Sequence, residues 1–232
     1  MFFEDKLIKG KIVHRYKSLI MDVELSTGEC VPVFCPEGDL ATEIHKVGNV
    51  VYVSKAKDKR RKISYNLELI DTSSGIVLAN SGHNLEMFME AFHAGLLPDF
   101  NDYSRIRMIE PSENIHHIDF ELSDENGNKC YVFITDMYHK IGVSAVFPAQ
   151  VSFFEMQMFE EMHKLRQKGH KTKVFMIAPR QDCLDVKFSW SIDPSSAARI
   201  FDEAKNGLEF VCYGCKIDKS GISIGKKLEI KF

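Results

Sequence analysis

The stretch that decides the fold runs from residue 117 to residue 135. It reads His-Ile-Asp-Phe-Glu-Leu (117–122), Ser-Asp-Glu-Asn-Gly-Asn-Lys (123–129) and Cys-Tyr-Val-Phe-Ile-Thr (130–135). Apolar and polar residues alternate in the first part, and β-favouring residues fill the third. Asp, Asn and Gly in the middle are the residues that make tight turns. The stretch therefore predicts a β-hairpin.

An Asp on one strand of a hairpin, followed by Glu-x-Lys on the next strand, is the arrangement of the PD-(D/E)xK nucleases, which this stretch resembles. There, two carboxylates hold Mg²⁺ or Mn²⁺, and the lysine orients the attacking water. Here Asp119 stands at the first position, but Phe133 replaces the Glu and Thr135 replaces the Lys. Phe offers no lone pair to a cation and Thr carries no charge. We therefore expect a nuclease fold without catalytic residues or a metal cofactor, with Asp119 as a vestige.

An alternative keeps the metal at a relocated site. Residues two apart in a strand share one face, so His117, Asp119 and Glu121 are expected to point the same way. Glu155, from the next predicted helix, would complete a ligand set. This alternative predicts a nuclease that depends on Mg²⁺ or Mn²⁺.

Residues 1–78 predict a first domain made of short strands. Turn residues at 26–29 and 36–39 separate β-rich runs. Five short strands in fewer than 80 residues are typical of a small barrel, most often an OB-like fold. The predicted strands are 7–13, 19–25, 30–35, 50–54 and 63–70.

Residues 79–232 predict a second, α/β domain, in which helices and strands surround one sheet. Helices are expected at 84–94, 151–168 and 193–207, with Gly95, Gly169 and Gly207 at their ends. The predicted strands beyond the hairpin are 173–178, 209–217 and 228–232. The apolar residues of helix 151–165 either fill the former catalytic cleft or form a surface for a partner, most simply a homodimer.

Taken in order along the chain, a series of short matches resembles the SfsA (sugar fermentation stimulation) family. The matching residues are Arg15-Tyr-Lys17, Asp22-Val23, Cys35-Pro36, Val47-Gly48, Arg61-Lys62, Leu67-Glu-Leu69, Asn80, Glu90-Ala91, Ile118-Asp-Phe120, Cys130-Tyr131, Phe147-Pro148, Ile192-Asp193 and Lys226-Lys227. The resemblance implies an N-terminal OB-like β-barrel, a restriction-endonuclease-like (PD-(D/E)xK) α/β domain and DNA binding. The family's Glu-Val-Lys is Phe133-Ile-Thr135 here, and its polar helix after Phe-Pro is Ser152-Phe-Phe-Glu-Met-Gln-Met158. Both departures indicate a catalytically inactive member.

The segment from Lys55 to Lys62 carries six positive charges and one negative charge between two predicted strands. Such a loop can grip phosphates, with Tyr16 as a stacking platform beside it. The expected nucleic-acid-binding residues are Arg15, Tyr16, Lys17, Lys59, Arg60, Arg61 and Lys62. The alternative is a solvated hairpin loop. Because the net charge of the 232-residue chain is -3, we expect weak, salt-sensitive binding of DNA or RNA.

No apolar run reaches the roughly 20 residues of a membrane span, and residues 1–6 do not read as a signal peptide. The six cysteines are scattered along the chain, which is typical of reduced thiols in a cytoplasmic protein.

Overall fold

The chain forms two compact units. The structure, a computed structural model, describes residues 1–16, 19–37, 44–110, 113, 117–147, 153–190 and 194–231, and of residues 153–155 only the backbone. The first unit comprises Met1–Met87 with the later segments Pro179–Asp182 and Gly214–Gly225, and the second comprises Phe88–Ala178, Cys183–Tyr213 and Lys226–Phe232. The predicted division into domains 1–78 and 79–232 stays a prediction.

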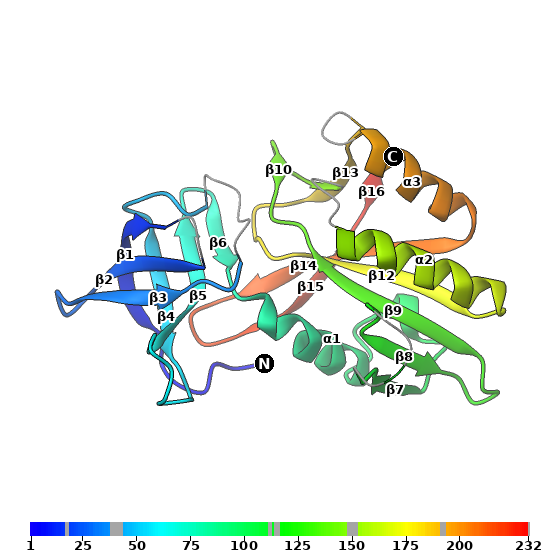
Figure 1. Ribbon diagram of the computed structural model, residues 1–232, viewed down its shortest axis with the longest axis horizontal. Coiled ribbons are helices and arrows are strands. Elements are labelled where there is room, and N and C mark those ends of the chain that lie inside the picture. Colours follow the sequence, from blue (N-terminus) through cyan, green and yellow to red (C-terminus); the bar gives the residue numbers. More distant parts are fainter. Residues whose placement is uncertain are drawn as a thin grey trace. The chain divides into compact units, whose positions relative to one another are not determined.

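The first unit is built on a closed barrel, as the sequence predicts (Figure 1). Its strands are β1 (Ile8–Arg15), β2 (Ile20–Leu25), β3 (Cys30–Phe34), β4 (Val50–Lys55), β5 (Tyr65–Thr72) and β6 (Gly75–Leu78). They follow the order β3-β2-β1-β4-β5-β6, and a parallel pairing of β3 with β5 closes the barrel. Gly10 permits the close approach of β1 to β2, because a Cβ atom there would lie 2.5 Å from Val23 Cγ1.

A six-stranded sheet of order β15-β14-β12-β9-β8-β7 lies mainly in the second unit, while residues 214–225 of β14 and β15 belong to the first. The predicted hairpin is β8 and β9, which pair antiparallel, and β12 lies parallel to β9. The strands are β7 (Arg105–Met108), β8 (Phe120–Ser123), β9 (Lys129–Asp136), β12 (Lys171–Ala178), β14 (Leu208–Ile217) and β15 (Ile222–Leu228). The helices are η1 (Ser81–His83), α1 (Asn84–His93), η2 (Pro98–Phe100), α2 (Phe153–Gln167) and α3 (Pro194–Lys205).

The expectation of one sheet after residue 79 is wrong. A second sheet of order β10-β11-β13-β16 is formed by β10 (Lys140–Ile141), β11 (Ser144–Phe147), β13 (Asp185–Phe188) and β16 (Ile230–Lys231). These strands are two to four residues long, too short to show alternation, and β11 pairs in parallel with the distant β13. Strand β7 was not predicted from the sequence. Because β7 pairs with β8, β8 is an interior strand of its sheet.

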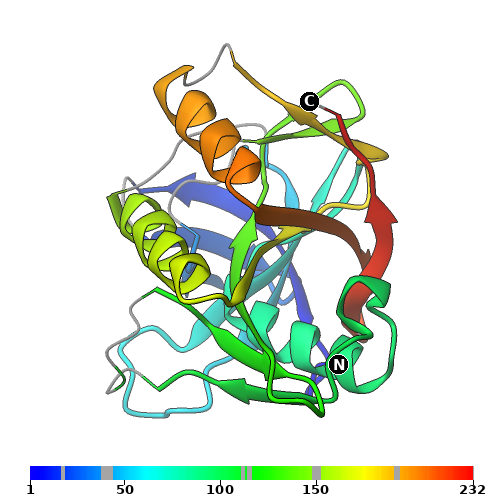
Figure 2. The ribbon, with the colours of Figure 1, turned by 90° about the vertical axis from the view of Figure 1, so that its right-hand side faces the viewer.

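Both faces of the six-stranded sheet are covered by other parts of the chain. On one face, Phe88 of α1 packs against Phe100, Phe120 and Phe175, with ring centroids 4.8–5.3 Å from its own. The other face carries α2, and Figure 2 shows α3 running beside α2 on that side. Four apolar side chains of α2 are buried in this core: Met158, Phe159, Met162 and Leu165. These four are therefore not available to a partner, and a homodimer through helix 151–165 stays a prediction.

All six cysteines are free thiols. Within the described parts of the chain, no helix is long and apolar enough to cross a membrane.

Candidate functional site: a degenerate metal site and a basic barrel surface

Asp119 is held against the backbone of the hairpin. It lies immediately before β8, its N–H donates to the carbonyl oxygen of Val132 (3.0 Å), and its Oδ2 accepts the N–H of Ile134 (2.7 Å). Burial raises the pKa of the Asp119 carboxyl to about 6, although the hydrogen bond from Ile134 acts in the opposite direction. A carboxylate at neutral pH is thus retained here at an energetic cost.

We predict that Asp119→Asn raises the free energy of unfolding at pH 7 by about 1–2 kcal/mol, a figure discounted for partial exposure. The amide oxygen can still accept the Ile134 N–H, while the desolvated charge is gone. Since the folded pKa of about 6 exceeds the ordinary 3.8, the wild type loses stability as pH rises from about 4 to 6. Urea unfolding at pH 7 and pH 3.5 checks this, and a variant equally stabilised at both would contradict it.

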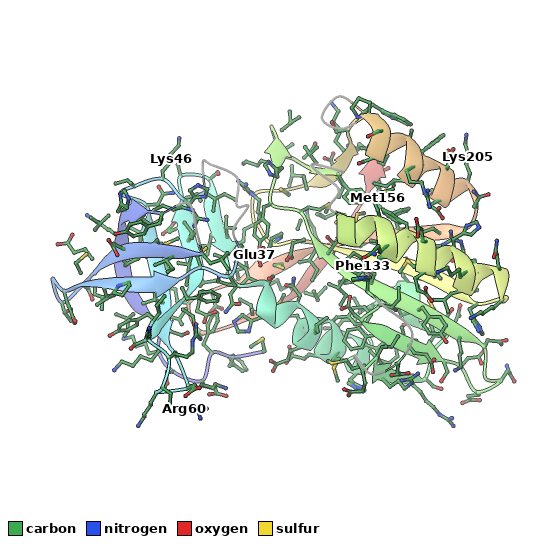
Figure 3. The ribbon with its side chains drawn as sticks, in the orientation of Figure 1. Glu37, Lys46, Arg60, Phe133, Met156 and Lys205 are labelled. Carbon is green, nitrogen blue, oxygen red and sulfur yellow. The ribbon has the colours of Figure 1, made fainter. Side chains whose placement is uncertain are left out.

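Phe133 and Thr135 share one face of β9. Phe133 is half-buried and packs against the core cluster that contains Met158 and Val174, and Met156 of α2 packs against the same cluster (Figure 3). Phe133 and Met156 thus extend the apolar core of the second unit.

We expect Phe133→Ala to lower the free energy of unfolding by about 1.5–2 kcal/mol, less than for a fully buried Phe. Phe2→Ala is the control, because Phe2 is 82% exposed and should change stability by less than about 0.5 kcal/mol. Paired thermal and denaturant melts measure both. Equal effects of the two substitutions would show that Phe133 is not part of the core.

Glu121 is committed to a network of donors on neighbouring strands. Arg107 of β7 donates to both of its carboxylate oxygens (3.2 and 3.1 Å), and Lys129 (3.0 Å) and Tyr131 (2.9 Å) donate to Oε2. Burial alone raises the pKa of Glu121, but these hydrogen bonds outweigh it and lower the pKa to about 2. Glu121 is therefore an ionised, structural carboxylate.

Three residues of the relocated metal site, His117, Asp119 and Glu121, do not form a group that could hold a metal ion. His117 is exposed and has a φ of 60°, and Glu121 is occupied by its cations. The side chain of Glu155 lies outside the described residues. Among the residues that the structure does describe, no group of three or more His, Cys, Asp or Glu could hold a metal ion. The relocated metal site therefore stays a prediction.

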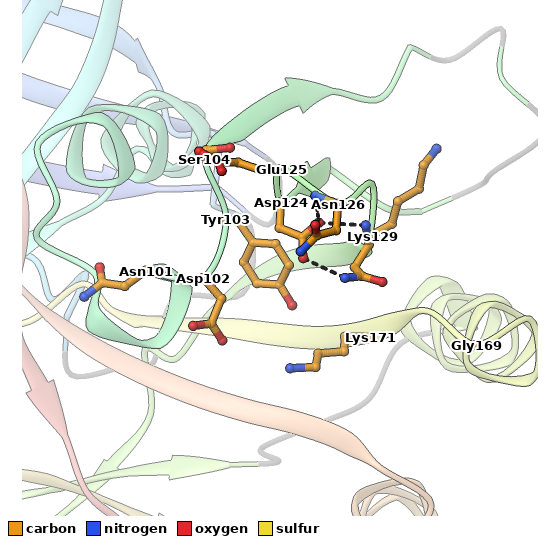
Figure 4. A pocket seen from close by; sticks show the side chains of 11 residues that line it. Asn101, Asp102, Tyr103, Ser104, Asp124, Glu125, Asn126, Lys129, Gly169 and Lys171 are labelled. Carbon is orange, nitrogen blue, oxygen red and sulfur yellow. Dashed lines mark hydrogen bonds between the residues drawn. The ribbon is translucent and has the colours of Figure 1, made fainter.

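A pocket of about 750 Å³ opens at the other end of β8, away from Asp119 (Figure 4). It is lined by the β8–β9 turn, by residues 101–104 and by Gly169 and Lys171. The Asp124 carboxylate is used by the turn itself, where it accepts hydrogen bonds from the N–H groups of Asn126 (2.9 Å) and Asn128 (2.8 Å). The pocket holds none of the residues predicted to bind nucleic acid.

The basic loop lies between β4 and β5, and its charged side chains are exposed. Two of its six cations are neutralised, because Lys57 pairs with Glu4 (2.7 Å) and Arg60 with Asp58 (3.0 Å). Within the described part of the chain, Lys55, Lys59 and Lys62 form no ion pair. In the view of Figure 3, Arg60 on this loop and Lys46 lie at opposite sides of the barrel. The sequence thus places the loop correctly but overestimates its free charge.

Arg15 and Arg61 contact adjacent residues at the end of β3. The Arg15 Nη1 donates to the Cys35 Sγ (3.4 Å), and the Arg61 guanidinium lies 5.1 Å from the ring centroid of the adjacent Phe34. Tyr16 follows Arg15 and is 46% exposed. Lys17, also predicted to bind nucleic acid, lies outside the described residues. Segments about 45 residues apart therefore meet the end of the same strand.

Two residues of this surface escaped sequence reasoning. Phe34 lies under Arg61, and Asn66 Oδ1 accepts a hydrogen bond from Arg61 Nη1 (3.0 Å). Neither residue type signals binding by itself. The one available signal was the proximity of Phe34 in sequence to the matched Cys35-Pro36 pair.

Comparisons with known proteins agree on one family. The family model described as the sugar fermentation stimulation protein RE domain matches residues 82–221. Sugar fermentation stimulation protein homologs of Nitrosococcus oceani and Maricaulis maris are each 28% identical, over 99% and 100% of this chain and 99% of their own. The structure of Pyrococcus furiosus SfsA in complex with Ca²⁺ superposes with a TM-score of 0.86 at 17% identity, covering 100% of this chain and 98% of that one. At that identity the likeness shows a shared fold.

Proposed function

Because this chain belongs to the SfsA (sugar fermentation stimulation protein) family, we propose that it binds nucleic acid through its barrel and does not cleave it. The observation that carries the proposal is the packing of Phe133 into the apolar core where a nuclease of this fold would need a carboxylate.

Loss of hydrolysis follows from the chemistry of the remaining groups. Metal-assisted phosphodiester hydrolysis requires a cation to polarise the phosphate and a polarised water as nucleophile. Asp119 offers one carboxylate bound to the Ile134 N–H, and Thr135 supplies no positive charge. Losing a metal ligand and the lysine together removes several kcal/mol of transition-state stabilisation.

Binding of nucleic acid is supported by the exposed lysines and Arg61 of the β4–β5 loop and by Arg15 at the end of β3. The contacts to phosphate are few and the whole chain has a net charge of -3, so binding should be weak and fall steeply with salt.

The test measures binding and cleavage on the same preparations. Fluorescence anisotropy with single- and double-stranded DNA, at low and at moderate salt, should show binding that weakens with salt. Plasmid and single-stranded DNA incubated with Mg²⁺ or Mn²⁺ should stay intact. No binding at low salt would remove the proposal of a nucleic-acid-binding protein, and metal-dependent cleavage would remove the proposal of inactivity.

A metal-dependent nuclease with a relocated site is the second candidate. The similarity to a protein solved in complex with Ca²⁺ favours it, as does the retained carboxylate of Asp119. It predicts a rise of Tm with Mg²⁺, Mn²⁺ or Ca²⁺ and DNA cleavage, both lost in Asp119→Ala. The matched control is Asp124→Ala, since Asp124 belongs to the β8–β9 turn.

A further inference from the structure

One outer face of the barrel presents planar groups to solvent, and Tyr16 on this face is 46% exposed. The Tyr16 N–H donates to the carbonyl oxygen of Ile20 (3.3 Å), and Ile20 pairs with Phe34 on the next strand. Tyr16 and Phe34 therefore flank Ile20 across three neighbouring strands, about 10 Å apart at strand spacing. We call Tyr16, Phe34 and Arg61 the stacking face.

The planar groups of the stacking face are held in place. The Tyr16 hydroxyl donates to Asp22 Oδ2 (2.7 Å), and the Tyr16 ring meets the His14 ring edge-to-face at 4.6 Å. The Arg61 guanidinium contacts the Phe34 ring and the Asn66 side chain, and Arg61 is exposed. Rigid planar groups lose little conformational entropy when a flat ligand stacks on them.

Charge divides this region into two parts. Asp22 places a carboxylate on the strand surface beside Tyr16, which disfavours a phosphate there. The unpaired lysines, Lys55, Lys59 and Lys62, are on the β4–β5 loop instead. A ligand that fits both parts carries phosphates toward the loop and uncharged planar rings onto the stacking face.

We infer that the stacking face binds unpaired bases, so that the ligand of the barrel is a single-stranded polynucleotide. The inference rests on the proposed nucleic-acid binding and narrows it. A duplex keeps its base faces stacked inside the helix, whereas a single strand offers them to aromatic and guanidinium planes.

The experiment compares four labelled 16-mer probes by anisotropy at low salt: oligo(dT), oligo(rU), a DNA duplex and an abasic phosphodiester chain. The wild type should bind oligo(dT) about 10-fold more tightly than the abasic chain. Tyr16→Ala should weaken oligo(dT) binding about 10-fold and leave abasic binding unchanged. Tyr16→Phe, which keeps the ring, should stay within about 3-fold of the wild type. Thermal melts establish that both variants are folded.

The outcomes separate this inference from the proposed function. Equal affinity for oligo(dT) and the abasic chain, or tighter binding of the duplex, would overturn the inference and leave nucleic-acid binding standing. An equal weakening of all four probes by Tyr16→Ala would also overturn the inference of base stacking and leave nucleic-acid binding standing. Absence of binding to every probe would overturn the proposed function itself. The ratio of oligo(dT) to oligo(rU) binding identifies DNA or RNA as the source of the single strand.

Discussion

Glu121→Ala should lower the free energy of unfolding by about 3 kcal/mol, the low end for removal of one partner from a buried ion pair. The substitution strands the hydroxyl of Tyr131 in the interior without its acceptor and leaves two cations without their carboxylate. Arg107 and Lys129 are 46% and 38% exposed, so water partly compensates them and keeps the loss from being larger. Urea unfolding at pH 7 measures the difference.

The matched control is Glu113→Gln. Glu113 also pairs with Arg107 (2.8 Å), but its side chain is 30% exposed, so its loss should cost much less than the loss of Glu121. Comparable losses at the two positions would show that burial of Glu121 does not matter.

Acid should erase the contribution of Glu121. The folded state keeps its carboxylate ionised down to a pKa of about 2, whereas the ordinary pKa is 4.5. The stabilisation is therefore complete above about pH 4.5 and is lost as pH falls toward 2. Unfolding of Glu121→Gln and wild type across this range should converge at the acid end, and a constant difference would contradict the assignment of Glu121 as an ionised group.

Replacing Lys55, Lys59 and Lys62 together by Ala should weaken binding of single-stranded DNA by about 100-fold at roughly 50 mM salt. These exposed lysines form no ion pair within the described residues, so each is free to displace a counterion from phosphate. The slope of log K against log salt should become shallower by about 2, because each phosphate contact on a single strand contributes about 0.7. Anisotropy titrations at four salt concentrations measure both quantities.

A variant with Lys46, Lys187 and Lys205 replaced by Ala is the control of equal charge. These lysines are exposed and lie outside the β4–β5 loop. The control variant should retain binding within about 3-fold, since only long-range charge changes. Equal losses in the two variants would show that net charge, and not the loop, governs binding.

Local sequence determined the main elements of both units. The 117–135 stretch forms its hairpin because alternation and turn residues act over neighbouring positions. Strands β1 to β5 of the barrel and helices α1, α2 and α3 were predicted for the same reason. Gly95 and Gly169 have the positive φ that ends a helix. Sequence alone also shows that Phe133 and Thr135 stand where the nuclease resemblance would place Glu and Lys, because this depends only on residue identity.

Only the tertiary structure decided what those residues contact. Arg107 joins Glu121 through β7, a four-residue strand with no periodic signal of its own, and the second sheet depends on the pairing of β11 with β13. Arg61 meets Phe34 because the barrel closes between β3 and β5. Such contacts are set by non-local strand pairing and by burial, which single-sequence patterns do not encode. The sequence therefore determined which chemical groups are present, whereas the tertiary structure determined which residues each group contacts.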